Sequence, residues 1–382
     1  GNHWTPMINE TKVKGYALSF IQDPLEKKLL FLGTENGLWL SSDEGSTWDQ
    51  IKNGFPSVST MDLVIQEKES ALVIGTFGRA LWVMDDLLSL RALIATNSKD
   101  KLIPLPLNEV VQVKGVFIAP PGNIWSGFHT TFEGENRPFQ KTRIPFFVND
   151  TTHELDSITA LIKDHEGTVI NSLVQKKITR GLNYITWKLD EKSTLLPGSW
   201  VNEESRGIPV LPGEYTAELS YKNEQKTILI KVISDPRFEI DQEVDQALYS
   251  YQKSVGVQVE RLTKLLNKLE HLEKNILSNQ LDFKTPSNKT LFLNQLKGLQ
   301  LRGREKPLNR QVGAWQSTKI TPYSVLKNAV KFSKSRLTIP SSHDWSLVEQ
   351  GKQLVDDFEK EVDRFYTKWE KEITRLDISQ DN

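Results

Sequence analysis

The segment Leu29-Leu30-Phe31-Leu32-Gly33-Thr34-Glu35-Asn36-Gly37-Leu38-Trp39 is repeated further along the chain as Ala71-Leu72-Val73-Ile74-Gly75-Thr76-Phe77-Gly78-Arg79-Ala80-Leu81-Trp82. Gly33 and Gly75 are 42 residues apart, and Trp39 and Trp82 are 43 apart. Each copy reads as an apolar strand, a turn after Gly-Thr and a second strand. A period of about 40 to 45 residues with several short strands per unit is typical of β-propeller blades. The repeat therefore predicts two blades within residues 1–98, with further strands at 16–21 and 61–65.

A second motif lies between the two copies. Ser41-Ser42-Asp43-Glu44-Gly45-Ser46-Thr47-Trp48 is similar to the Asp-box, S-x-D-x-G-x-T-W, of bacterial neuraminidase repeats. We expect the Asp43 carboxylate to accept backbone N–H groups in a tight turn, Gly45 to supply a permissive backbone position, and Trp48 to fill the space between neighbouring sheets. The resemblance implies a structural role for Ser41, Asp43, Gly45, Thr47 and Trp48 at the blade periphery, away from any central active site.

The pattern changes twice after the repeat. Residues 99–109 are polar and contain proline, which predicts a linker. Short alternating strands between Pro and Gly turns then predict an immunoglobulin-like β-sandwich over residues 110–235. From residue 236 apolar residues recur at helical spacing, first from Val244 to Ile276 and again from Leu354 to Ile373, which predicts a helical bundle over 236–382. The expected fold class is multidomain β plus α: a partial β-propeller of two blades, an Ig-like β-sandwich and a C-terminal α-helical bundle.

Taken together, these features resemble the large bacterial sortilin-type or BNR-repeat propeller proteins, which are frequent in Bacteroidetes and are commonly labelled glycosyl hydrolases. The resemblance rests on the Asp-box, the Ig-like segment, the helical tail, and a blade turn with its exit. Residues 132–139 also look like that family's link from propeller to sandwich. The blade turn and exit comprise Gly75, Thr76, Gly78, Arg79, Asp85 and Asp86. The resemblance implies that this chain is the C-terminal portion of such a protein, with the remaining propeller blades as its first partner.

Composition excludes several classes of function. Lys and Arg total 48 against 49 for Asp and Glu, so no global field would attract nucleic acid. The chain has no cysteine, and its 6 histidines show no metal-ligand spacing, so we expect neither a metal nor another cofactor. No apolar stretch approaches the roughly 20 residues that span a bilayer. The chain begins at Gly1 without an initiator Met, which we interpret as a processed or truncated product.

Catalysis by this chain is not expected. A glycosidase needs two carboxylates at a defined separation across the scissile bond. Asp85 and Asp86 are adjacent, so on a strand they would point to opposite faces, and we interpret them as capping the last blade. Two blades also cannot supply the set of residues that a sialidase-like site gathers around a propeller axis.

Each of three further features allows two interpretations. Trp125 and Trp200 lie in loops of the sandwich, where they form either a sugar-stacking platform or aromatic plugs under the loops. A basic run is either a solvated loop or a site for phosphate or an acidic partner. It comprises Lys297, Arg302, Arg304, Lys306 and Arg310. Asp150-Thr151-Thr152 and Asp156-Ser157-Ile158 resemble the O-glycosylation motif of exported Bacteroidetes proteins, with Thr151 and Ser157 as acceptors, or match it by chance.

The leading functional hypothesis is a non-catalytic binding or scaffold portion of a large exported propeller protein. It would engage a protein complex or a glycan in the periplasm, at the outer-membrane surface or outside the cell. One alternative is the accessory region of a glycoside hydrolase whose active site lies in N-terminal blades absent here. Another is a subunit of an outer-membrane transport or secretion assembly. In each case we expect the two blades to complete a ring with a preceding polypeptide, because their strands carry more apolar positions than two sheets can bury.

Overall fold

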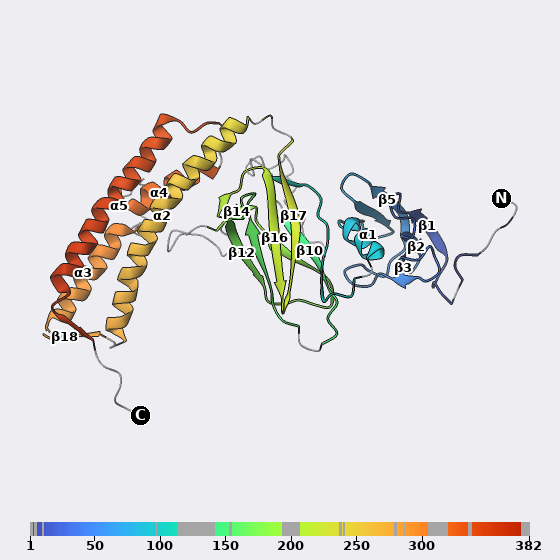
Figure 1. The fold of residues 1–382 in the computed structure, drawn as a ribbon, viewed down its shortest axis with the longest axis horizontal. Helices are drawn as coiled ribbons and strands as arrows, with labels where there is room; N and C mark the ends of the chain where they lie inside the picture. Colours follow the sequence, from blue (N-terminus) through green and yellow to red (C-terminus); the bar gives the residue numbers. More distant parts are fainter. Residues whose placement is uncertain are drawn as a thin grey trace, which may run out of the picture. The chain divides into compact units, whose positions relative to one another are not determined.

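The structure is a computed structural model, and it shows a mixed β and α protein in which antiparallel sheets precede the C-terminal helices (Figure 1). This confirms the expected β plus α class. The residues that the structure describes are 3, 6–9, 11–96, 98–112, 142–152, 155–192, 207–236, 239, 241–278, 281–285, 287–304, 320–334 and 338–375. They belong to two compact units. The first comprises residues 1–111, 121–187 and 212–233, and the second comprises residues 112–120, 188–211 and 234–382.

The N-terminal part of the first unit forms two antiparallel sheets. The first sheet has the order β1 (Ala17–Gln22), β2 (Leu30–Thr34), β3 (Gly37–Ser41) and β4 (Asp49–Gln50). The second sheet has the order β5 (Thr60–Gln66), β6 (Ala71–Thr76) and β7 (Leu81–Met84). Both sheets have the same register across their first three strands, and both have a register shift near the start of the first strand. The sequence repeat is therefore also a structural repeat.

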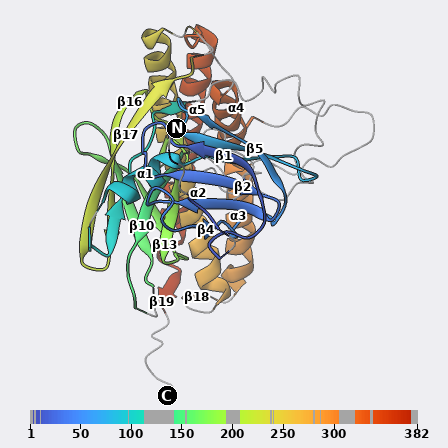
Figure 2. The ribbon, with the colours of Figure 1, turned by 90° about the vertical axis from the view of Figure 1, so that its right-hand side faces the viewer.

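The two N-terminal sheets stack face to face around one apolar core. Phe31 and Leu38 of the first sheet pack in the same buried cluster as Leu72 and Ile74 of the second. Strands β1 and β5 lie side by side at one margin of this stack (Figure 2). Strand β2 also approaches β5, and this requires a glycine on β2, because a Cβ atom on Gly33 would lie 2.5 Å from the carbonyl oxygen of Thr60.

Helix α1 (Leu87–Ala95) follows β7 and was not predicted from the sequence. Leu87, Leu90 and Ile94 of α1 belong to the same core as the two N-terminal sheets. The helix has nine residues, and its apolar residues are not confined to one face, so its stability depends on this packing rather than on local propensity. Segment 99–109, expected as a linker, contains strand β8 (Leu102–Pro104), which pairs with β10 (Thr142–Val148) of the same unit.

The rest of the first unit consists of two further sheets, most of whose strands lie in the segment where the sequence predicts a sandwich. Their remaining strands are β9 (Val110–Gln112), β10 (Thr142–Val148), β11 (Ile158–Lys163), β12 (Val169–Gln175), β13 (Gly181–Trp187), β16 (Gly213–Tyr221) and β17 (Glu224–Ser234). The sheet orders are β13-β10-β8 and β12-β11-β16-β17-β9. Alternate residues such as Ile158, Ala160 and Ile162 are fully buried, as expected for sheets with one apolar face. The rings of Trp187 and Tyr215 pack edge to face, with their centroids 5.5 Å apart, and connect the two sheets.

The second unit contains the helical region. Its elements are β14 (Asp190–Glu191), β15 (Ile208–Pro209), α2 (Gln242–Leu277), β18 (Leu281–Phe283), α3 (Ser287–Gly303), α4 (Pro322–Lys334), α5 (Ser342–Trp369) and β19 (Ile373–Arg375). Buried residues at helical spacing, such as Leu262, Leu266 and Leu269, form one core with the other helices. The periodic series of α5 ends at Trp369. Ile373, which the sequence assigned to the terminal helix, instead lies in β19 and pairs with Phe283 of β18.

Candidate interaction surface

The turn after β3 is held by its own polar side chains. The Asp43 carboxylate accepts hydrogen bonds from the Thr47 backbone N–H at 2.8 Å, the Thr47 hydroxyl at 2.7 Å and the Ser41 hydroxyl at 2.8 Å. These bonds, those from Thr47 first, hold the pKa of Asp43 below its ordinary value. Gly45 has a φ of +87°, in the region that favours glycine.

Trp48 directs its ring onto the first sheet. Its indole N–H donates to the carbonyl of Gly45 at 3.1 Å, and the side chain is buried with Leu30 and Trp39. The cluster lies on the face of the first sheet that points away from the second sheet. The acidic and aromatic groups of this motif are thus occupied within their own turn and sheet.

The turn between β6 and β7 is held in a similar way. The Thr76 hydroxyl donates to the carbonyl of Ala80 at 2.7 Å, and the Trp82 indole N–H donates to the carbonyl of Arg79 at 2.9 Å. Gly78 has a φ of +86°. The three atoms nearest to a Cβ atom on Gly75 would all belong to Asp62, at 3.5 to 3.8 Å.

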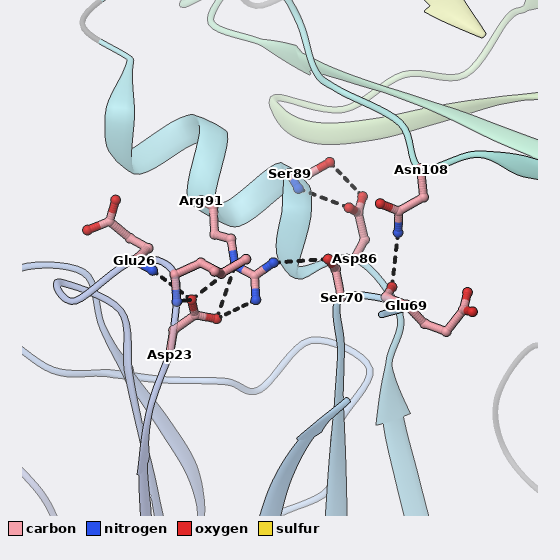
Figure 3. A network of polar contacts seen from close by, with 9 residues as sticks. Asp23, Glu26, Glu69, Ser70, Asp86, Ser89, Arg91 and Asn108 are labelled. Atoms are coloured by element: carbon pink, nitrogen blue, oxygen red, sulfur yellow. Dashed lines mark hydrogen bonds and ion pairs between the residues drawn. The ribbon is translucent and has the colours of Figure 1, made fainter. Parts of the chain in front are cut away.

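A buried ion pair connects α1 to loops of both N-terminal sheets (Figure 3). The Arg91 guanidinium donates two hydrogen bonds to the Asp23 carboxylate, from Nε at 3.0 Å and from Nη2 at 2.8 Å, and a third to the Ser70 hydroxyl at 2.9 Å. Burial alone would raise the pKa of Asp23. The bonds from Arg91 and from the backbone N–H groups of Glu26 and Leu25 outweigh it and hold that pKa below its ordinary value. Sequence analysis did not single out this pair, since its members are 68 residues apart.

Asp86 caps α1. Its carboxylate accepts from the Ser89 backbone N–H at 2.9 Å and from the Ser89 hydroxyl at 2.6 Å. It also accepts from the Tyr184 hydroxyl at 2.9 Å, which ties the start of α1 to β13. Burial, with the nearby Asp86 charge, raises the pKa of Tyr184 well above its ordinary value. Asp86 is therefore engaged by the helix start and a tyrosine.

One face of the second sheet carries a group of apolar side chains that is open to solvent. Val64, Val73 and Val83 pair across β5, β6 and β7, so they form one row on this face, and Leu81 lies in the next row. Val64 is 54% exposed, Leu81 72% and Val83 41%. We call Val64, Val73, Leu81 and Val83 the open face. The alternation of strands β5 and β7 could have identified these residues, but only the stacking shows which face is left uncovered.

The four residues of the open face include none of the other predicted site residues. Thr151 and Ser157 are both exposed, in segments next to β10 and β11. Of the basic run, Lys297 and Arg302 lie on α3 rather than in a loop, and Arg304 follows the end of this helix. Arg302 forms an ion pair with Glu361, and Arg304 forms one with Glu270. Lys306, Arg310, Trp125, Trp200 and segment 132–139 lie outside the described residues.

Within the ranges that the structure describes, no group of three or more His, Cys, Asp or Glu residues is arranged to hold a metal ion. No helix in the described part of the chain is long and apolar enough to cross a membrane.

No protein-family model and no curated protein matches this chain. Solved structures similar to parts of it include two of an extracellular domain from B. thetaiotaomicron, described as belonging to a one-component system in one case and to a hybrid two-component system in the other. Their sequence identities are 10% and 12%, and the TM-score is 0.17 for both. Each alignment covers 57% of this chain and 25% of the other, so the chain spans about a quarter of their length. A TM-score this low shows no common overall fold, and we infer nothing about function from it.

Proposed function

We propose that this chain is a non-catalytic binding and scaffold portion of a large exported β-propeller protein. In this proposal the β1–β4 and β5–β7 sheets are two blades, the following two sheets form an Ig-like sandwich, and the C-terminal helices form a bundle. The chain acts by presenting surfaces to a protein complex or a glycan at the cell envelope.

The open face of the second sheet is the observation that carries this proposal. Four large aliphatic side chains on adjacent strands form a contiguous apolar surface. Such surfaces on soluble proteins mark sites of interaction, because exposed apolar area costs about 25 cal/mol per Å² relative to burial. Leu81, the most exposed of the four, lies on the edge strand β7.

The geometry of the carboxylates supports a structural role for the residues that follow the second sheet. Asp86 is tied to Ser89 and Tyr184 by hydrogen bonds. The retaining and inverting glycosidase mechanisms require two carboxylates that face each other across a substrate, about 5 to 10 Å apart. A carboxylate committed to a helix N-cap and a tyrosine does not fit that requirement.

A cysteine-labelling experiment tests whether the open face binds a partner. The chain has no natural cysteine, so Val83→Cys introduces a single thiol. We expect a maleimide to modify this thiol rapidly in the isolated chain. In the protein as its own cells produce it, modification should slow by about tenfold, the change expected when roughly nine in ten molecules have the face covered.

Leu229→Cys is the matched control. Leu229 is also an aliphatic strand residue, 59% exposed on β17, but it is not part of the open face. It should react equally fast in both preparations. Equal reactivity of Val83→Cys in the isolated chain and in the native protein would contradict the proposal.

A further inference from the structure

The structural repeat allows the open face to be compared, residue by residue, with a face whose partner is visible. Register and sequence align Ile21, Phe31, Leu38 and Leu40 of the first sheet with Val64, Val73, Leu81 and Val83 of the second. In the first sheet this set contributes to the core between the two sheets. Phe31 and Leu38 are completely buried there. The open face is thus the counterpart of a face that receives a sheet.

The structure also shows which surface packs against this face of the first sheet. It is the other side of the second sheet, where Leu63, Ile74 and Trp82 pair in one row across the three strands. Their counterparts in the first sheet are Phe20, Leu32 and Trp39, which also pair in one row. Each sheet therefore carries two different apolar faces, and the contact between the sheets joins one face of each kind.

The glycines of the repeat supply an independent observation. A Cβ atom on Gly33 would lie 2.2 Å from Ser19 Oγ and 2.5 Å from the Thr60 carbonyl oxygen of the stacked sheet. Gly75 occupies the equivalent position beside Leu81, yet a Cβ atom there would make only ordinary contacts with Asp62. Nothing in the described part of the chain approaches Gly75 as Thr60 approaches Gly33. A glycine at position 75 leaves room for another backbone to approach as closely as Thr60 approaches Gly33.

We propose that the open face receives a further antiparallel sheet of the same repeat, which docks with its tryptophan-bearing face. This proposal rests on the proposed binding function of that face. The docking sheet would place residues equivalent to Leu63, Ile74 and Trp82 against the open face, and its first strand would approach Gly75. The contact is head to tail, since it joins unlike faces, and such contacts can close into a ring.

The first sheet of a second copy is a poorer occupant. On its tryptophan-bearing face, Leu32 and Trp39 are already packed against Trp48 and against Val13 and Ile8 from the N-terminal segment. Docking of a second copy would have to displace these residues.

Photocrosslinking identifies the occupant. Leu81 is replaced by p-benzoylphenylalanine in the protein as its own cells produce it, and the crosslinked peptide is sequenced after irradiation. We expect a peptide with the repeat's pattern, in which an apolar strand runs into Gly-Thr and a second strand contains Trp. A crosslink to a helical segment, to lipid or to an unrelated protein overturns this proposal even when Val83→Cys is protected. In that case the binding function still stands, whereas loss of both crosslink and protection contradicts both proposals.

Gly75→Ala gives a second and separate test. We expect this variant to leave the unfolding of the isolated chain unchanged. In the native protein it should abolish the roughly tenfold protection of Val83→Cys, because the new Cβ atom meets the docked strand. Gly298→Ala on α3 is the control, since a Cβ atom there meets nothing closer than 3.9 Å. Unchanged protection in Gly75→Ala, or destabilisation of the isolated chain, would overturn the proposal.

Discussion

Arg91 determines how α1 is attached to the two N-terminal sheets. Its guanidinium is buried and reaches loops of both sheets, through Asp23 and Ser70. A buried guanidinium without a carboxylate partner is costly, so this pair is a point where a single substitution has a large effect.

We predict that Asp23→Asn destabilises the chain by about 3 to 5 kcal/mol, the usual cost of removing one partner of a buried ion pair. Urea unfolding measures the loss. Asp100→Asn, which removes a solvent-exposed pair with Lys226, should change stability little. Similar losses for the two variants would mean that the Arg91 pair is not buried in solution.

The same carboxylate predicts a pH dependence. The pKa of Asp23 in the folded chain lies below its ordinary value of 3.8, so the charged form is favoured by folding. Its contribution to stability is therefore complete above the ordinary value and is lost as pH falls through the lower, folded-state pKa. The stability difference between the parent chain and Asp23→Asn should be constant near neutral pH and shrink on acidification below 3.8. A difference that grows in acid would contradict this sign.

Trp48 gives a prediction about packing. Trp48→Ala should cost about 3 to 5 kcal/mol, because it removes a buried aromatic side chain from the face of the first sheet. Phe77→Ala is the control, since Phe77 is 75% exposed in the turn before β7 and should have little effect. A loss below about 1 kcal/mol for Trp48→Ala would show that this ring is not buried in solution.

The two N-terminal sheets have the same register across their first three strands, but different surfaces cover them. Gly33 and Gly75 occupy the same place in the repeat, and only Gly33 is confined by the neighbouring sheet. The local sequence around Gly33 and Gly75 is thus similar, but only Gly75 has room for a side chain.

We predict that Gly33→Ala destabilises the isolated chain by about 1 to 3 kcal/mol, the usual cost of overpacking. Gly75→Ala should stay within about 0.5 kcal/mol of the parent. Urea unfolding of the two variants side by side tests this difference. Equal effects would contradict the face-to-face stacking of the sheets.

Over the whole molecule, the described residues form two compact units, one rich in strands and one rich in helices. Neither unit is expected to need a metal. Excess EDTA should therefore leave the circular dichroism and the urea unfolding curve of the chain unchanged. Loss of helical signal on chelation would reveal a metal site that the sequence does not indicate.

The isolated chain should also lack glycosidase activity. Purified chain incubated with aryl glycosides should release no aryl product above the uncatalysed rate. Turnover that survives purification and disappears in Asp85→Asn or Asp86→Asn would contradict the proposed function and favour a catalytic role for these carboxylates.

Features that depend on neighbouring residues could be derived from the chain alone. The order of β region and α region, the strands of the repeat, and the long helix from Gln242 to Leu277 all follow from apolar periodicity, which reports the geometry of an element directly. The repeat also predicted that the strands of the two blades carry more apolar residues than two sheets can bury. It could not indicate which of its faces is covered.

Features that depend on distant contacts required the tertiary structure. Helix α1 is short and is stabilised by a core that two sheets provide, so its own sequence carries little signal. Ile373 continues a helical pattern, yet it pairs with Phe283 in a strand because the chain turns after Trp369. The pairing of Arg91 with Asp23, the hydrogen bond from Tyr184 to Asp86 and the open face beside Gly75 were likewise visible only after folding. Each arises from groups brought together across tens of residues, and a one-dimensional pattern does not encode such distances.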